Sequence, residues 1–143
     1  MSIEWITRGA RHETPDTTRA DDAAKRLLAR SNRTGAEVSV LLTDDAGIHA
    51  LNRQWRNMDK PTDVLSWPLE EANGESLGDV AISLDTAMRQ AQARGWDIAD
   101  EIALLLIHGI LHLLGYEDET EAGAESMRDV ERELLGKPLE KTE

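Results

Sequence analysis

Apolar residues recur along the chain with two different spacings. Short β-prone stretches, in which apolar residues alternate or cluster, predict strands. These stretches are residues 3–6, 37–43, 64–68 and 77–83. Longer stretches with apolar residues three and four positions apart predict helices. They lie within residues 14–30, 44–56, 84–95, 98–114 and 119–135. This order of elements favours an α+β fold, in which a small mixed sheet of about four strands is packed by helices.

Two of the predicted helices have contrasting apolar patterns. The helix near residues 44–56 has its apolar residues on one stripe, so we expect Ile48, Leu51 and Trp55 to face inward. The helix at residues 98–114 is apolar on nearly every side. We therefore expect it to be a central, buried helix that runs through the middle of the fold.

The bulk composition is that of an ordinary globular protein. The chain has 143 residues, of which 40% are hydrophobic and 31% are charged, so we expect a single domain over residues 1–143 with its last few residues loose. Phe is absent and the aromatic residues are four Trp and one Tyr, so the core must consist mainly of Leu, Ile, Val and Ala. The chain has no Cys, so a metal ion would be bound by His, Asp or Glu.

The net charge of −12 disfavours non-specific binding to nucleic acid or to anionic membranes. A nucleic-acid substrate would therefore require a local basic patch. The longest apolar run, residues 102–114, is interrupted by two histidines and is too short to span a membrane. The first residues lack the apolar core of a signal peptide, so we expect a cytoplasmic protein with no membrane partner.

Two histidines in the central helix have the spacing of a metal site. His108 and His112 are one helical turn apart, so both rings project from the same side. Gly115 can end the helix and reverse the chain, which would bring Asp118 back toward the rings as a third ligand. A catalytic zinc ion takes three protein ligands and keeps one position open. The pattern favours one Zn²⁺ site over a pair of histidines that only form hydrogen bonds in the core.

Asp118 also has a second interpretation. It precedes the last predicted helix, and Glu121, three residues later, completes a pattern like a capping box. Glu117 and Glu119 are alternative ligands within reach of the two rings. We take Asp118 as the third ligand and keep the capping role as the alternative.

The residue after the first histidine bears on the reaction. Metzincin proteases share the spacing of this motif and carry Glu directly after the first His as the general base. Gly109 stands at that position here. The pattern argues against peptide hydrolysis, unless another carboxylate takes that role.

Three segments resemble the YbeY family of bacterial endoribonucleases, which mature ribosomal RNA. HGILHLLGYED, residues 108–118, is similar to the family motif H-G-x-L-H-L-x-G-Y-D-H. LNRQWRNMDKPTDVLSWPLE is similar to L-N-x-x-x-R-x-x-D-x-P-T-D-V-L-S-F-P, and SLGDVAIS is similar to the L-G-D-x-x-I stretch. Together they cover roughly the central half of the chain, in the family's order. Two positions depart from the family: Trp67 replaces a Phe, and Asp118 replaces the final His.

Phosphodiester cleavage needs positive groups around a phosphate that gains charge in the transition state. Arg56 aligns with the family's arginine, so the resemblance implies a catalytic role for it. On a helix, His49 and Arg53 share a face with Arg56, and Lys60 follows in the loop. This set is either a basic patch, with Arg53 and Lys60 as substrate-binding residues, or a solvated polar face. We interpret Asp63 as a helix or turn cap.

The resemblance implies a zinc-dependent endoribonuclease that acts on single-stranded RNA. Its role would be the maturation of ribosomal RNA, at the 3′ end of the small-subunit RNA, and ribosome quality control. His108, His112 and Asp118 would hold one Zn²⁺, and ribosomal proteins or the small ribosomal subunit would be partners. Two alternatives stay open: a metzincin-like metalloprotease, and a non-enzymatic ribosome assembly factor whose structural zinc is closed by a fourth ligand such as Glu117.

Overall fold

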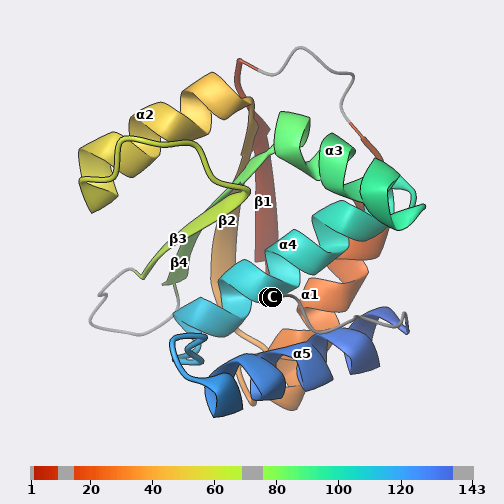
Figure 1. Ribbon diagram of the computed structural model, residues 1–143. Coiled ribbons are helices and arrows are strands. Elements are labelled where there is room, and N and C mark those ends of the chain that lie inside the picture. Colours follow the sequence, from red (N-terminus) through yellow and green to blue (C-terminus); the bar gives the residue numbers. More distant parts are fainter. Residues whose placement is uncertain (1, 10–14, 69–75, 137–143) are drawn as a thin grey trace.

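A mixed sheet organises the fold (Figure 1). The computed structural model describes residues 2–9, 15–68 and 76–136. Their strands are β1 (Ser2–Thr7), β2 (Glu37–Thr43), β3 (Val64–Pro68) and β4 (Ser76–Ser83), in the order β1-β2-β4-β3. β2 pairs in parallel with β1 and β4, whereas β3 runs antiparallel beside β4. The prediction of a small mixed sheet of four strands is confirmed.

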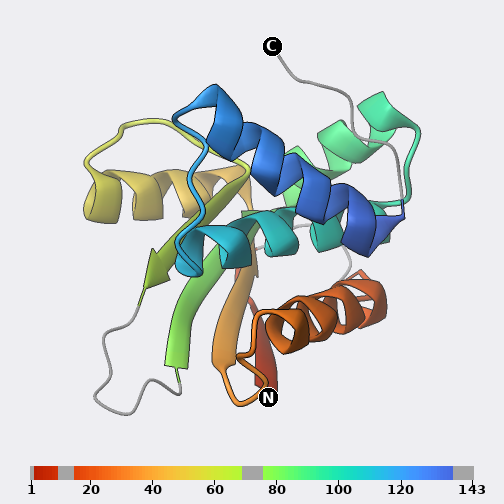
Figure 2. The same cartoon turned by 90° about the horizontal axis from the view of Figure 1, so that it is seen from below.

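Helices cover both faces of this sheet. They are α1 (Thr18–Arg30), α2 (Asp45–Arg56), α3 (Leu84–Arg94), α4 (Ile98–Leu113) and α5 (Glu121–Leu135). α4 crosses one face of the sheet next to α1, and α5 packs on the side of α4 that is turned away from the strands (Figures 1 and 2). α2 covers part of the opposite face. The histidine helix thus lies in the middle of the molecule, as the sequence predicts.

Alternation along the strands assigns their side chains to the two faces. Val40 and Val80 belong to the large core that the sheet forms with α1 and α4. Their neighbours Leu41 and Ala81 point the other way, where they pack with Ile48 of α2 in a smaller cluster. The strands therefore carry apolar residues on both faces, because helices cover both.

The helix ends are set by capping residues. Asp44, Ser83 and Thr120 occupy the N-cap positions of α2, α3 and α5, and each side chain accepts a hydrogen bond from the backbone N–H three residues later. Gly95 and Gly136 follow α3 and α5 in the left-handed conformation that favours glycine. These local signals explain why the helices begin and end close to the positions that the sequence predicts.

Gly109 lets α4 approach the sheet closely. A Cβ atom at this position would lie 2.8 Å from Val80 Cγ1 and 3.1 Å from its Cγ2. Val80 is fully buried, and a β-branched side chain has little rotameric freedom to move away. The glycine after the first histidine is therefore a packing requirement of this fold, and a glutamate side chain does not fit there.

The prediction that Trp55 faces inward is wrong. The residue is 61% exposed, whereas Ile48 and Asn52 are the buried residues of α2. Trp55 belongs to the last turn of the helix, where it lines an open, largely apolar cavity of about 560 Å³ together with Leu51 and Trp67. The predicted apolar stripe faces the sheet over the first turns of α2. Its last turn does not, because the helix covers only part of the sheet face.

Smaller differences concern boundaries. The first helix begins at Thr18, after Pro15, and the last begins at Glu121 rather than near residue 119. The last few residues of the chain, which are predicted to be loose, lie outside the described residues. Among the helices that the structure describes, none has the length and apolar character needed to cross a membrane.

Candidate metal centre and substrate cavity

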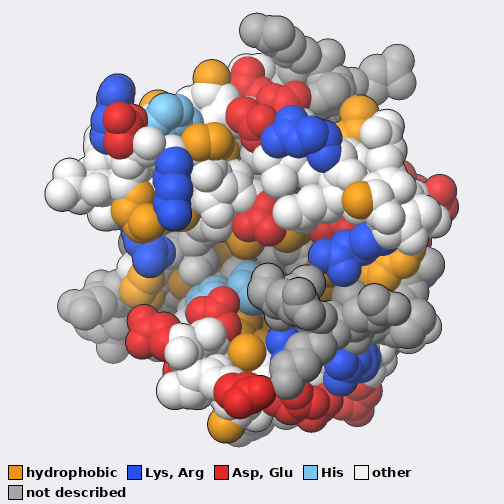
Figure 3. All heavy atoms as spheres, viewed as in Figure 1, with side chains coloured by type: hydrophobic (Ala, Val, Ile, Leu, Met, Phe, Trp, Pro, Cys, Tyr) orange, Lys and Arg blue, Asp and Glu red, His pale blue; other side chains and the backbone are white. Residues whose placement is uncertain are grey.

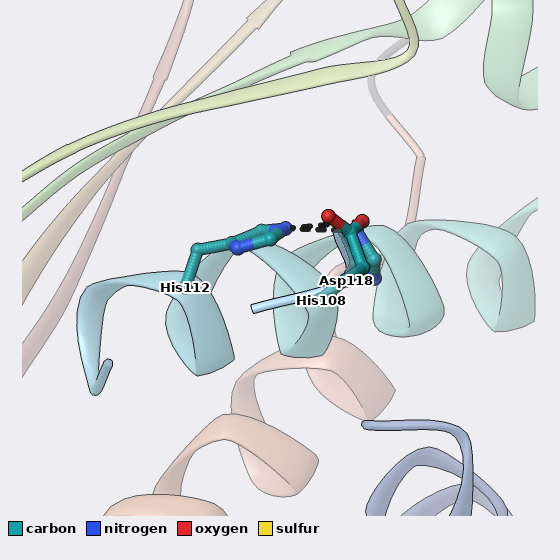
Figure 4. A group of neighbouring side chains, drawn as sticks. All are labelled: His108, His112 and Asp118. Atoms are coloured by element: carbon teal, nitrogen blue, oxygen red, sulfur yellow. Dashed lines mark hydrogen bonds and ion pairs between the residues drawn. The ribbon is translucent and has the colours of Figure 1, made fainter. Parts of the chain in front are cut away.

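Two histidines and one aspartate converge at the C-terminal end of α4 (Figure 4). The Nε2 atoms of His108 and His112 are 3.2 Å apart, and the rings meet edge to face. Gly115, with φ of 103°, reverses the chain after the helix. The reversal places Asp118 Oδ2 3.6 Å from both Nε2 atoms. The three residues that the sequence nominates as metal ligands are thus brought together, with one donor atom each facing a common point.

Hydrogen bonds on the far side of each ring fix which nitrogen faces that point. His108 Nδ1 lies 3.0 Å from Glu131 Oε2, and His112 Nδ1 lies 3.2 Å from the carbonyl oxygen of Tyr116. Both partners accept hydrogen bonds, so each Nδ1 carries the proton and donates it. Each neutral ring then presents an Nε2 lone pair to the centre. Metal-binding histidines in proteins are held in the same way.

The electrostatics of the group suit a cation. Two lone pairs and a carboxylate oxygen repel one another unless a positive charge lies between them, so the donor set fits a divalent metal ion such as zinc. Burial alone would lower the pKa of His108, but the hydrogen bond that its ring donates to Glu131 and the charges of Glu131, Asp118 and Asp63 raise it overall. This raised pKa reflects the negative potential that surrounding carboxylates create at the ring.

The capping interpretation of Asp118 is wrong, because Thr120 is the N-cap of α5. Its Oγ1 accepts a hydrogen bond from the backbone N–H of Gly123 at 3.0 Å. Glu117 supports this turn: its carboxylate accepts from the backbone N–H groups of Glu119 and Thr120 and from Thr120 Oγ1. These hydrogen bonds lower the pKa of Glu117. Asp118 is left to face the histidines, and neither Glu117 nor Glu119 belongs to the converging group.

A cavity of about 700 Å³ opens beside this group, between α4 and the segment that joins α2 to β3. Histidine side chains are visible in the hollow at the middle of the face in Figure 3. Arg56 and Lys60 line the cavity together with His108, His112 and Asp118. Two of the predicted basic residues are therefore brought to the candidate metal centre.

The other two basic residues of the predicted patch lie elsewhere. His49 Nε2 forms a hydrogen bond of 2.7 Å with Asp59 Oδ1, and the charge of Arg53 also acts on that carboxylate. Arg53 is not part of the cavity lining. The loop is held by Asn52, whose buried side chain donates a hydrogen bond of 2.9 Å to the carbonyl oxygen of Lys60. This contact keeps Lys60 near the mouth of the cavity.

Two acidic residues at the site were not predicted. Glu131 is buried, and its place on the apolar stripe of α5, four residues after Met127, is a signal that the sequence offers. Asp63 was interpreted as a cap, but it lines the cavity and accepts a hydrogen bond of 3.3 Å from Gln90 of α3. A carboxylate on a buried helix face needs a partner, and for Glu131 that partner is His108.

Comparisons of the sequence with known proteins all match one family. A family model described as "Endoribonuclease YbeY" matches residues 7–138. A protein of that name from Anaeromyxobacter dehalogenans is 48% identical over 131 residues, covering 85% of this chain and 66% of the relative. Another from Nautilia profundicola is 50% identical over 104 residues and covers 73% of each chain.

A solved structure shows the same fold. The solution structure of TM1509 from Thermotoga maritima superposes with a TM-score of 0.61 at 27% identity, covering 94% of this chain and 89% of the other. The chain spans 65% to 79% of the lengths of the curated relatives compared.

Proposed function

The chain belongs to the YbeY family of endoribonucleases, and from this premise we propose that it is a zinc-dependent endoribonuclease that cleaves single-stranded RNA. The observation that carries the proposal is the convergence of two Nε2 atoms and one carboxylate oxygen beside a cavity that also holds an arginine. The proposed role is the maturation of ribosomal RNA, at the 3′ end of the small-subunit RNA, and ribosome quality control. The small ribosomal subunit and its proteins are the proposed partners, and the cytoplasm is the proposed location.

We assign the metal to His108, His112 and Asp118. When bound, a zinc ion at such a site supplies Lewis acidity and makes a coordinated water more acidic. Glu131 keeps the ring of His108 in the orientation and tautomer that ligation requires. The carboxylate of Asp118, where the family motif has a histidine, adds a negative charge, so it makes the centre a weaker Lewis acid than three histidines would.

Arg56 is proposed to grip the scissile phosphate. A guanidinium binds two phosphate oxygens at once and stabilises the charge that they gain in the transition state. Arg56 forms no ion pair with any residue that the structure describes, so its charge is available to a ligand. Lys60, at the same cavity, adds attraction for the backbone of the RNA. Arg53 lies outside this lining, which leaves it at most a peripheral role in binding.

The two alternatives are less well supported. The glutamate that metzincin proteases use as general base has no counterpart at position 109, which packs against Val80, so a protease would have to use another carboxylate of the cavity. A structural zinc would need a fourth protein ligand, but the carboxylate of Glu117 is engaged with the first residues of the α5 cap. A site with three protein ligands keeps one position open for the reaction.

Three alanine variants test the proposal. We expect His112→Ala to lose metal and RNA cleavage together. Arg56→Ala should retain metal and lose about 100-fold in kcat, the usual effect of removing one group that stabilises transition-state charge. Arg53→Ala is the matched control, because it removes the same charge from the same helix outside the cavity. If Arg56→Ala cleaves single-stranded RNA as fast as Arg53→Ala does, the role of Arg56 is wrong.

A further inference from the structure

A second cavity lies on the other side of the candidate metal centre. It has a volume of about 430 Å³ and is lined mainly by residues of α3, α4 and α5. Asp63, His108 and Asp118 line both cavities, so the two spaces meet at the metal ligands. A ligand that occupies the first cavity and reaches past the centre enters the second.

The arginines of the two cavities differ in their pairing. In the second cavity, Arg94 lies 3.0 Å from Glu101 and Arg128 lies 3.2 Å from Glu125. In the first cavity, by contrast, neither cation has an ion-pair partner within the part of the chain that the structure describes. A dianionic phosphate group would gain less from cations whose charge is already compensated. The second cavity therefore suits an uncharged group.

The walls of the second cavity suit a flat, partly apolar group. Leu104 and Leu105 of α4 and Met127 of α5 form an apolar side, and a methionine sulfur makes favourable contacts with aromatic rings. A volume of this size accepts a group as large as a nucleoside. Bases of single-stranded RNA are free to leave the stack and enter such pockets.

Two polar atoms of residues that line the second cavity lack partners. Gln90 Oε1 and Arg128 Nε are buried and have no hydrogen bond to any described residue. The Gln90 amide nitrogen donates to Asp63, which fixes its oxygen as the free acceptor. Buried polar atoms without partners are unfavourable, and a small rotation of either side chain toward the edge of a base would satisfy them. The Watson–Crick edge of every nucleobase offers both a donor and an acceptor.

We propose that the cavity between α3, α4 and α5 is a binding site for the nucleobase adjacent to the scissile phosphate, with Arg128 and Gln90 contacting its edge. The inference rests on the proposed function, because it takes the substrate to be single-stranded RNA. In this arrangement the phosphate lies on the side of Arg56, and the neighbouring base passes the metal ligands into the second cavity.

The first test compares a normal RNA oligonucleotide with one that has an abasic ribose next to the scissile bond. Arg128→Met keeps the length of the side chain and removes the guanidinium; Arg132→Met, one turn later on α5 and outside both cavities, is the control. We expect Arg128→Met to lower kcat/KM about tenfold on the normal RNA, which corresponds to about 1.4 kcal/mol, and to leave cleavage of the abasic RNA unchanged. Equal losses on both substrates would mean that Arg128 contacts the backbone, and the inference would be overturned.

The second test does not depend on activity. Met58 lines the first cavity and Met127 lines the second, whereas Met88 lines neither. We expect adenosine or cytidine, which carry no phosphate, to shift the methyl NMR signal of Met127, and inorganic phosphate to shift that of Met58. The nucleoside effect should disappear in Arg128→Met.

The outcomes of the two tests separate the inference from the proposed function. If the wild type cleaves RNA and nucleosides leave Met127 unchanged, the base site is wrong and the endoribonuclease stands. If nucleosides shift Met127 and the wild type cleaves no RNA, the base site stands and the proposed function fails.

Discussion

Replacing Gly109 by alanine measures how closely α4 must approach the sheet at the metal centre. The new Cβ would lie 2.8 Å from Val80 Cγ1, 3.1 Å from Val80 Cγ2 and 3.5 Å from Val64 Cγ2. Overpacking of this kind destabilises a core by about 1–3 kcal/mol. Alanine also has a higher helix propensity than glycine, which stabilises by about 1 kcal/mol. The two effects together predict a net loss of about 1 kcal/mol in the free energy of unfolding.

The same substitution should have the opposite sign where the contact is absent. Val80→Ala removes both Cγ atoms and makes room for the new methyl group. In that background we expect Gly109→Ala to stabilise the protein by about 1 kcal/mol, because the propensity gain remains and the clash is gone. Urea unfolding of the four proteins gives all the free energies needed. If Gly109→Ala changes the stability equally in both backgrounds, the steric explanation of the glycine is refuted.

Three further predictions concern the supports of the site and the ionisation of a buried glutamate. Glu131→Gln should weaken zinc binding about 10- to 100-fold in a chelator competition, because His108 loses the partner that orients its ring. Glu133→Gln, on the exposed side of the same helix, should leave zinc binding unchanged. Asp118→Ala should weaken zinc binding with little change in stability, whereas Thr120→Ala should destabilise by about 1 kcal/mol through the lost cap; the reverse pattern would restore the cap to Asp118. Burial raises the pKa of Glu101 to about 6 from 4.5, so this residue binds more protons in the folded state, and its contribution to stability should fall by about 2 kcal/mol as pH rises from 4.5 through 6. In urea unfolding at a series of pH values, the difference in stability between the wild type and Glu101→Gln should change by that amount.

Much of the fold could be predicted from local patterns, because strands and helices of this chain carry clear apolar periodicity and capping residues. The pair His108 and His112 and the turn at Gly115 depend only on residues close in sequence. Their geometry therefore follows from the helix and its end, as the predicted metal motif requires. That residues 1–143 form a single domain stays a prediction, which a single cooperative unfolding transition would support.

The features that could not be predicted depend on contacts between distant segments. Trp55 is exposed because the end of α2 extends over an open part of the sheet face, and no local pattern reveals where a helix loses its partner. Glu131 reaches His108 only through the packing of α5 on α4. Asp63 meets the site from the start of β3, and its partner Gln90 lies on α3. Thr120 rather than Asp118 caps α5, because the hydroxyl of Thr120 accepts the hydrogen bond from the backbone N–H of Gly123.

The most direct test of the central claim is RNA cleavage by the wild type and the His108→Ala/His112→Ala variant, measured side by side with the metal content of each. Circular dichroism should first establish that the variant is folded. The account predicts that the wild type contains zinc and cuts single-stranded RNA, and that the variant contains no metal and loses cleavage. A folded, metal-free variant that cleaves RNA at the rate of the wild type would contradict it.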